Sequence, residues 1–310
     1  MILTVTLNTS IDKLYLMNGI QPETVMRVQE VHNTAGGKGL NVSKVAGKLG
    51  EKVTAMGFAG GFNGRYLESL VTNPNVRCAF TRVQGETRSC INCWDLTDGR
   101  STEYLEPGEP VTPEEVARFQ ADFACRLPEA DVVTISGSIP AGAPEDIYCT
   151  LIRQCKKAGV PVMVDTSGKR LVSAAQEKPT FLKPNTDEIV QLTGRSPETM
   201  EERAETMASL HRSGIPYAVL SLGAEGALLA CAEGIFHGCP PTIVPKNTVG
   251  CGDSMVAGFA VGLARRLQAE ECFRVSLAVS AANALSLFTG DFDEADYQDL
   301  YPRITVSRLR

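Results

Sequence analysis

Several features that define other protein classes are scarce in this sequence of 310 residues. It has one tryptophan and three histidines, and its 30 basic residues are outnumbered by 36 acidic ones. The net charge of −6 argues against a surface for nucleic acid or anionic membrane, which needs a basic stripe. No hydrophobic run approaches the roughly 18 residues of a membrane span, and the first residues lack a secretory signal. We therefore expect a cytoplasmic protein that binds neither nucleic acid nor membrane.

The ten cysteines do not form a disulfide framework, because they are scattered along the chain. Cys90 and Cys93 form one C-x-x-C pair, but a structural zinc site needs a second pair, and none is present. The pair also lies in an alternating segment that is typical of a strand. The three histidines share no ligand spacing. We expect neither a structural metal nor a redox site from these residues.

Apolar runs rich in β-branched residues alternate with segments of helical periodicity, a pattern typical of a parallel sheet covered on both faces. The composition, with 43% hydrophobic and 21% charged residues, is that of an ordinary globular protein. We therefore predict an α/β fold. The predicted strands are Ile2–Leu7, Val53–Phe58, Asp131–Ser136, Val160–Asp165, Thr180–Leu182 and Tyr217–Ser221, and the predicted helices are 42–49, 63–72, 113–126, 144–158, 186–193 and 197–213.

Residues 11–34 and 86–106 do not follow this alternation of strands and helices. Their polar and apolar side chains alternate, and no helix interrupts either segment. Alternation indicates a sheet with one face in water. The two segments are predicted to form a small antiparallel lid that covers a ligand or pairs with another subunit. Since no repeat, linker or low-complexity tract divides the chain, we predict one domain over residues 1–310.

The strongest chemical motif surrounds Gly250, Gly252 and Asp253, where a helical apolar stripe begins. Glycines before a helix leave amides free, and the positive end of the helix dipole then favours a phosphate or developing negative charge. A carboxylate in the first turn can accept a hydroxyl proton. On spacing alone, a glycine-rich turn with Asp253 as a plain helix cap is the favoured explanation of the motif.

A second glycine cluster runs from Gly36 through Gly37 and Gly39 to Asn41 and opens another helix. Its glycines permit close approach of the backbone to a ligand, and Asn41 offers a donor and an acceptor to a polyol. The cluster matches neither a Walker A loop nor a dinucleotide fingerprint. Two clusters of this kind favour phosphoryl transfer over a dehydrogenase.

Both clusters resemble the signature sequences of the PfkB (ribokinase-like) family of carbohydrate kinases. The first, with Gly50 and Gly60 further on, fits the family pattern throughout. The second fits except at Cys251, where the family usually has a smaller residue. Two more motifs are similar to those of the family, namely Lys183-Pro-Asn185-Thr-Asp-Glu188 and Ser221-Leu-Gly223-Ala-Glu-Gly226. The resemblance covers nearly the whole chain.

This resemblance implies a three-layer ribokinase-like fold and transfer of the γ-phosphoryl group of ATP to a sugar hydroxyl. Asp253 would be the general base, and the amides of Gly250, Cys251 and Gly252 would form the anion hole. The implied acceptor-binding residues are Asp12, Arg27, Gly36, Gly37, Lys38, Asn41, Arg88 and Ser138. From the residues alone, a turn aspartate is the less favoured explanation of Asp12, and a solvated surface position is the alternative for the arginines, more so for Arg27 than for Arg88.

On the nucleotide side, the resemblance implies that Asn185 and Glu188 bind Mg²⁺ through water, with Lys183 near the triphosphate. It also implies a nucleotide pocket lined by Ser221, Gly223 and Gly226, and it allows a monovalent cation. As a plain sequence feature, Glu188 is also an ordinary acid in the first turn of a helix.

Within the family, the chain looks most like the tagatose-6-phosphate kinase and 1-phosphofructokinase branch, as in Gly85-Glu-Thr-Arg88 and Thr134-Ile-Ser-Gly-Ser138. The resemblance implies a ketohexose monophosphate as acceptor, with tagatose 6-phosphate favoured over fructose 1-phosphate. Two arginines would be superfluous for a neutral sugar such as ribose. A catalytically silent sugar-phosphate or nucleotide-binding regulator on the same fold is the other hypothesis. The lid also suggests a homodimer.

Overall fold

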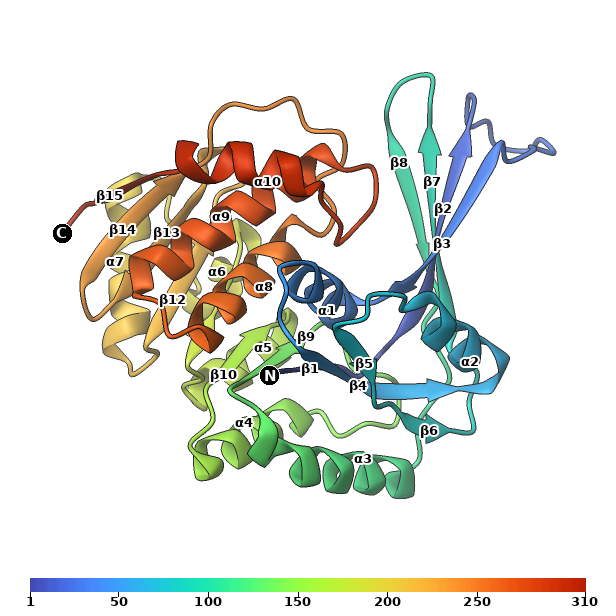
Figure 1. The fold of residues 1–310 in the computed structure, drawn as a ribbon, viewed down its shortest axis with the longest axis horizontal. Helices are drawn as coiled ribbons and strands as arrows, with labels where there is room; N and C mark the ends of the chain where they lie inside the picture. Colours follow the sequence, from blue (N-terminus) through green and yellow to red (C-terminus); the bar gives the residue numbers. More distant parts are fainter.

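Eleven strands form one sheet through the centre of the molecule, and the computed structural model describes all 310 residues (Figure 1). The strand order is β15-β14-β13-β12-β11-β10-β9-β1-β4-β5, and β6 pairs with β4. Pairing is parallel from β5 to β12 and antiparallel from β12 to β15. The strands are β1 (Ile2–Thr6), β4 (Val53–Gly60), β5 (Val76–Cys78), β6 (Thr81–Val83), β9 (Val132–Ser136), β10 (Val162–Asp165), β11 (Phe181–Leu182), β12 (Tyr217–Ser221), β13 (Ala227–Cys231), β14 (Gly234–Cys239) and β15 (Thr305–Arg308).

The mainly parallel sheet confirms the predicted α/β class. All six predicted strands form, and each begins and ends within two residues of its expected bounds. Strand β1 explains why these segments are apolar almost without interruption. Its residues are all buried, and it pairs on both sides, with Ile2 in register with Val53 and Val132. A strand covered on both faces has no side that favours polar residues.

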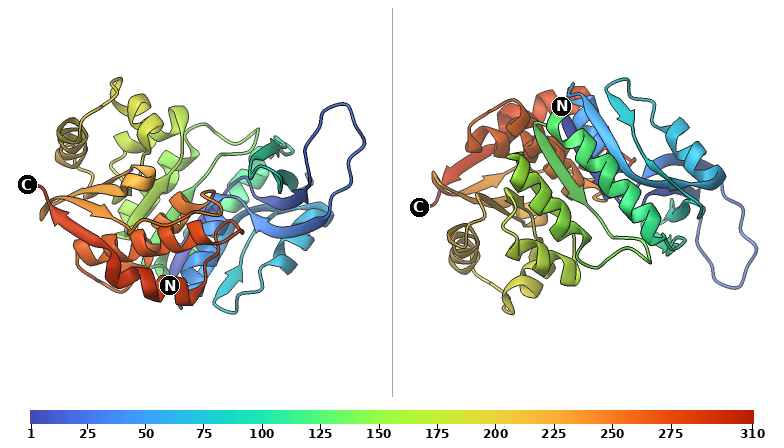
Figure 2. Two further views of the ribbon diagram at one scale, coloured as in Figure 1. Left: turned by 90° about the horizontal axis from the view of Figure 1, so that it is seen from above. Right: turned by 90° about the horizontal axis from the view of Figure 1, so that it is seen from below.

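Helices cover both faces of this sheet and complete three layers (Figures 1 and 2). Helices α1, α2, α8, α9 and α10 pack on one face, and α3 to α7 pack on the other. No helix is both long and apolar enough to cross a membrane. The helices are α1 (Lys38–Lys48), α2 (Gly61–Leu70), α3 (Pro113–Arg126), α4 (Ile147–Ala158), α5 (Gly168–Gln176), α6 (Thr186–Thr193), α7 (Met200–Arg212), α8 (Cys251–Ala264), α9 (Ala269–Leu285) and α10 (Glu294–Leu300).

Close packing of α8 against α9 fixes the helix that carries the Asp253 motif. Gly258 and Gly262 face α9 so closely that a Cβ at Gly258 would lie 2.6 Å from Ser276 Cα. A side chain at either position would therefore push the helices apart. Both helices are buried on nearly all sides. As a result, the start of α8 is held rigidly against the end of α9.

A separate four-stranded sheet, the lid, projects from one end of the body (Figure 1). Its strands are β2 (Ser10–Met17), β3 (Glu30–Gly36), β7 (Arg88–Asp95) and β8 (Ser101–Leu105). The pairs β2–β3 and β7–β8 are antiparallel hairpins formed by the two alternating segments. The hairpins join through parallel pairing of β2 with β7, in register from Ser10 and Arg88, because both strands run outward from the body. The lid is therefore antiparallel within each hairpin and parallel between them.

Candidate active site

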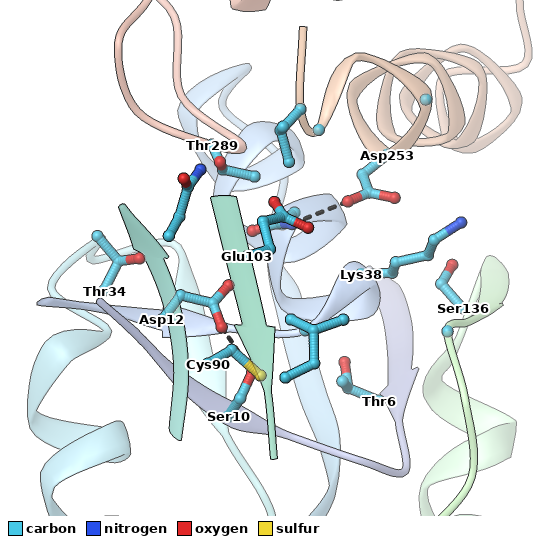
Figure 3. A pocket seen from close by; sticks show the side chains of 18 of the residues that line it. Thr6, Ser10, Asp12, Thr34, Lys38, Cys90, Glu103, Ser136, Asp253 and Thr289 are labelled. Carbon is cyan, nitrogen blue, oxygen red and sulfur yellow. Dashed lines mark hydrogen bonds between the residues drawn. The ribbon is translucent and has the colours of Figure 1, made fainter. Parts of the chain in front are cut away.

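A cavity of about 550 Å³ lies between the lid and the carboxyl ends of the central strands (Figure 3). In open α/β sheets, this edge is where ligands bind, because loops and helix N-termini converge there. Five residues that were predicted for the site do not line the cavity, namely Arg27, Gly36, Gly223, Gly226 and Cys251. The predicted residues that do line it are Asp12, Gly37, Lys38, Asn41, Arg88, Ser138, Lys183, Asn185, Glu188, Ser221, Gly250, Gly252 and Asp253.

Helix α8 presents its N-terminus to this cavity. The preceding residue, Gly250, has a φ of 84°, which is in the left-handed region that glycine tolerates. A Cβ there would also lie 2.7 Å from the Thr289 methyl carbon. No side chain caps the helix, and the amides of Gly252 and Asp253 have no main-chain acceptor. These two amides and the helix dipole can therefore bind an anion.

Cys251 takes a different place from the one predicted for it. Its amide, expected in the anion hole, instead donates to Thr248 O at 3.3 Å because the chain turns tightly into the helix. Its thiol accepts a hydrogen bond from Asn283 Nδ2 at 3.5 Å and does not line the cavity. Burial raises the pKa of this thiol to about 11. A protonated thiol outside the cavity has no part in nucleophilic chemistry.

The Asp253 carboxylate is buried in the first turn of α8 and reaches the cavity (Figure 3). Asn41 Nδ2 donates to Asp253 Oδ2 at 2.8 Å, so the two glycine clusters meet at this bond. Burial raises the pKa of Asp253 to about 6, although the Lys38 ammonium opposes the rise. A carboxylate with a pKa near neutrality is suited to accept a proton from a hydroxyl.

Two lysines close enough to influence the Asp253 carboxylate both pair with a second buried aspartate, Asp165. Asp165, at the end of β10, is fully buried, and its two oxygens each lie 3.3 Å from an ammonium nitrogen, that of Lys38 and that of Lys183. Burial opposes ionisation of Asp165, but the ammonium groups of Lys183 and Lys38 hold its pKa below the usual value. Lys183 Nζ is also only 3.3 Å from the position of a Cβ on Gly252. The lysines therefore add positive charge beside the free amides of α8.

Asp12 lies on the lid side of the cavity (Figure 3). Its Oδ1 accepts a hydrogen bond from Ser10 Oγ at 2.6 Å. Burial raises the pKa of this carboxyl group, whereas the Ser10 bond and the nearby Lys44 oppose the rise. A Cβ on Gly36 would lie 2.0 Å from Asp12 Cγ. Gly36 thus contributes by leaving room for the aspartate rather than by lining the cavity.

A cluster of hydrogen-bond donors lies at the base of the lid. Arg88 donates through Nη1 to Glu106 O at 2.8 Å and through Nη2 to Asn8 O at 3.2 Å, while its Nε is buried without a partner. Asn8 Nδ2 donates to Ser138 Oγ at 3.2 Å. Arg88, Asn8 and Ser138 all line the cavity. Guanidinium, amide and hydroxyl donors at one place suit a phosphate group.

Arg27 lies away from this cluster of hydrogen-bond donors. It is exposed in the turn between β2 and β3, at the outer end of the lid, and does not line the cavity. The sequence interpretation placed it with Arg88 because both lie in the lid segments. The structure separates them because Arg88 begins a strand at the body, whereas Arg27 lies at the far turn of the other hairpin.

The opposite end of the cavity contains the motif at the start of α6. Asn185 and Glu188 form a capping box, in which Asn185 Oδ1 accepts from the Glu188 amide at 2.8 Å and Glu188 Oε2 accepts from the Asn185 amide at 2.9 Å. Both side chains also line the cavity. Gly223 and Gly226 instead shape the turn after β12, where a Cβ at Gly226 would lie 2.0 Å from Gly238 O. Those two glycines therefore belong to the turn that follows Ser221 and do not line the cavity.

Comparison with known families identifies the family to which the chain belongs. Residues 5–294 match the family described as pfkB family carbohydrate kinase. The chain belongs to this PfkB family. It is therefore an ATP-dependent sugar kinase, and the free amides, lysines and buried carboxylate described above line the cavity of its fold or lie beside it.

Solved structures of similar proteins agree with this assignment. Phosphofructokinase-2 from Escherichia coli, in complex with substrates and products, is 29% identical, with a TM-score of 0.91 over 97% of this chain and 98% of that one. A structure of the same enzyme is in complex with potassium. A protein of Thermotoga maritima described as a possible 1-phosphofructokinase is 26% identical, with a TM-score of 0.86 over 100% and 99%. Ribokinase from Arabidopsis thaliana, at 21% identity, a TM-score of 0.74 and coverage of 97% and 98%, shares the fold.

Several residues in or beside this cavity were not predicted from the sequence. Asp165 has a detectable signal, because it is a carboxylate that ends an apolar strand at the ligand-binding edge. The polar residues Thr6, Asn8 and Ser136 follow the same rule at the ends of β1 and β9. Phe288 and Thr289 have no such signal, since they reach the cavity from a loop after α9.

Proposed function

We propose that this kinase transfers the γ-phosphoryl group of Mg-ATP to a hydroxyl of a ketohexose monophosphate, with tagatose 6-phosphate as acceptor and tagatose 1,6-bisphosphate as product. The donor cluster of Arg88, Ser138 and Asn8 carries this proposal, because a neutral sugar has no group that needs a guanidinium. The motifs of the tagatose-6-phosphate kinase branch favour tagatose over fructose. The neighbour described as a possible 1-phosphofructokinase supports fructose 1-phosphate as the alternative acceptor.

In this proposal, Asp253 accepts the proton of the attacking hydroxyl while the hydroxyl oxygen bonds to the γ-phosphorus. The ADP oxygen leaves as that bond forms. The Gly252 and Asp253 amides stabilise the charge on the transferring group, and Lys38 and Lys183 add to this stabilisation. Asn41 holds the base through its bond to Oδ2, and Asp12 accepts hydrogen bonds from sugar hydroxyls.

The residues at the start of α6 fit a hydrated Mg²⁺ ion. The capping box uses Oε2 of Glu188, no hydrogen bond within the protein occupies Oε1, and Glu188 lines the cavity. No cluster of three His, Cys, Asp or Glu side chains could enclose a metal ion. In this proposal, Mg²⁺ is held by the Glu188 carboxylate, by water and by substrate phosphates. When bound, Mg²⁺ neutralises charge on the nucleotide phosphates.

Glu188→Gln should raise the Mg²⁺ concentration needed for half-maximal rate about tenfold, because the carboxylate charge is lost while the capping box is kept. Steady-state rates measured against free Mg²⁺ check this. Glu202→Gln makes the same change in the capping box of α7 and should have no effect. An equal response of both variants would show that the charge at Glu188 does not serve the metal.

The rate should depend on pH through Asp253. As the pH falls below about 6, kcat/KM should decrease about tenfold per pH unit, because the protonated carboxyl group of the free enzyme cannot accept the hydroxyl proton. Above that pH, kcat/KM should reach a plateau. Rates at subsaturating sugar phosphate across the acid range check this, with stability followed in parallel. A kcat/KM that stays constant through pH 6 in the folded enzyme would contradict the assignment.

The acceptor is tested by ADP release with Mg-ATP and tagatose 6-phosphate, fructose 1-phosphate, fructose 6-phosphate or ribose. We expect the highest kcat/KM with tagatose 6-phosphate and the lowest with ribose. Preference for fructose 1-phosphate would support the alternative acceptor, and preference for ribose would contradict a phosphate-binding site at Arg88. Binding of sugar phosphate without turnover of any acceptor would indicate a silent regulator.

We also propose that a monovalent cation supports activity, as the potassium complex of the E. coli enzyme suggests. Rates at constant ionic strength with potassium or with tetramethylammonium test this. Equal rates in the two salts would reject the cation.

The lid is proposed to pair with the lid of a second copy. Its hairpins carry exposed apolar side chains, which favour an interface over permanent contact with water. Light scattering at micromolar protein should give the mass of a dimer, and a monomer would reject this pairing. The exposed apolar residues of the lid are Val25, Val31, Leu96, Tyr104 and Leu105.

A further inference from the structure

The loop after α9, residues 286–290, contacts both halves of the phosphoryl-transfer site. At Thr289, the methyl carbon would lie 2.7 Å from a Cβ on Gly250, which precedes the anion hole. At Gly290, a Cβ would lie 2.8 Å from the Cβ of Asn41, which holds the general base. A shift of this loop would therefore disturb the free amides and Asp253 together.

Buried side-chain hydrogen bonds fix one end of this loop to α8. Asn283 is fully buried, and its Oδ1 accepts from the Gly290 amide at 3.0 Å and from Ser254 Oγ at 3.1 Å. Its Nδ2 donates to Val249 O at 3.1 Å. These bonds connect the loop to the turn that precedes the anion hole. None of these bonds involves Thr289.

Thr289 is instead bonded by Lys44 of α1. Its Nζ donates to Thr289 O at 3.0 Å. Burial lowers the pKa of this ammonium, and the negative charges of Asp12, Asp291 and Asp253 oppose that change. One turn further along α1, Lys48 pairs with the Asp291 carboxylate at 2.7 Å nearer the surface. Only the first of these two lysines bonds to the backbone of a residue that lines the cavity.

We propose that Lys44 is a positioning residue for phosphoryl transfer, whose ammonium holds the 286–290 loop against α1 so that the anion hole and Asp253 stay aligned. Lys44 itself does not line the cavity. The proposal concerns the transfer step of this kinase and holds for any of the acceptors named above. Displacement of reacting groups by about 1 Å costs about 10²-fold in rate, so a modest shift of the loop has a large effect.

Lys44→Met tests the proposal, because it keeps the length of the side chain and removes the donor. We expect kcat to fall about 30- to 100-fold, with KM for ATP and for the sugar phosphate within about threefold of the original values. Lys44→Arg keeps a donor and should recover most of the rate. Lys48→Met, which removes the neighbouring surface lysine, should leave kcat unchanged.

Rates are compared per folded molecule, with thermal unfolding measured for every variant. A folded Lys44→Met enzyme with normal kcat overturns the proposal. A rate loss that Lys44→Arg fails to restore, or that Lys48→Met reproduces, also overturns it. If Lys44→Met does not fold, Gly290→Ala decides, because its new Cβ presses the same loop away from Asn41. A folded Gly290→Ala enzyme should lose kcat with KM little changed, and normal kcat in that variant contradicts the proposal.

Discussion

Asp253→Asn is expected to lower kcat by at least about 10²-fold while ATP binds nearly as before, because the variant loses the proton acceptor and keeps the shape of the side chain. The hydrogen bond from Asn41 is retained by the new amide oxygen, so the geometry of the two glycine clusters should persist. The free amides of α8 are main-chain groups and are not altered. Single-turnover rates and ATP titrations measure the two quantities separately.

The matched control for this variant is Asp122→Asn, the same chemical change on the surface of α3. It should leave kcat and both KM values unchanged. Near-full turnover in Asp253→Asn would reject Asp253 as the general base. Loss of ATP binding equal to the loss of rate would indicate that Asp253 supports the site as a whole rather than proton transfer.

Arg88→Ala is expected to raise KM for the sugar phosphate about 30-fold and KM for ATP by less than about threefold, because about 2 kcal/mol of charge-assisted hydrogen bonding to the acceptor phosphate is lost. Arg88 lines the cavity, and its guanidinium carries N–H groups beyond the two that bond to main-chain carbonyls. Initial rates measured with each substrate varied in turn give the KM for the sugar phosphate and the KM for ATP separately.

Arg88 also bonds to two main-chain carbonyls at the base of the lid, so the variant needs structural controls. Arg88→Lys keeps the charge and loses the planar fork, and it should show an intermediate KM. Arg82→Ala removes a surface arginine that pairs with Glu68 and should change neither KM. Equal increases in KM for both substrates would place Arg88 outside the acceptor site.

The central strands were predictable because their apolar runs report burial on both faces, as in β1 and β4. Helix α9 was not predicted, since it is buried on nearly all sides and lacks the periodic polar face that marks a helix. The parallel pairing of β2 with β7 was also beyond prediction. It joins residues more than 70 positions apart, and local alternation does not specify the partner of a strand.

The candidate site was predictable where a motif carries the chemistry, as with Asp253 and Asn41. Their direct hydrogen bond was not, because it depends on how two distant helix starts meet. Asp165 and Lys44 lie outside any motif and act through contacts with other side chains or the backbone. Arg27 does not line the cavity of this chain, because its place in a lid segment does not by itself bring its side chain to the site.

The most direct measurement is ³¹P nuclear magnetic resonance of the products formed from Mg-ATP and tagatose 6-phosphate. The buried carboxylate, the free amides and the donor cluster at Arg88 together predict one ADP for each new phosphate ester, on a sugar that keeps its original phosphate. Release of ADP with inorganic phosphate, and no second ester on the sugar, would contradict transfer to a bound sugar phosphate.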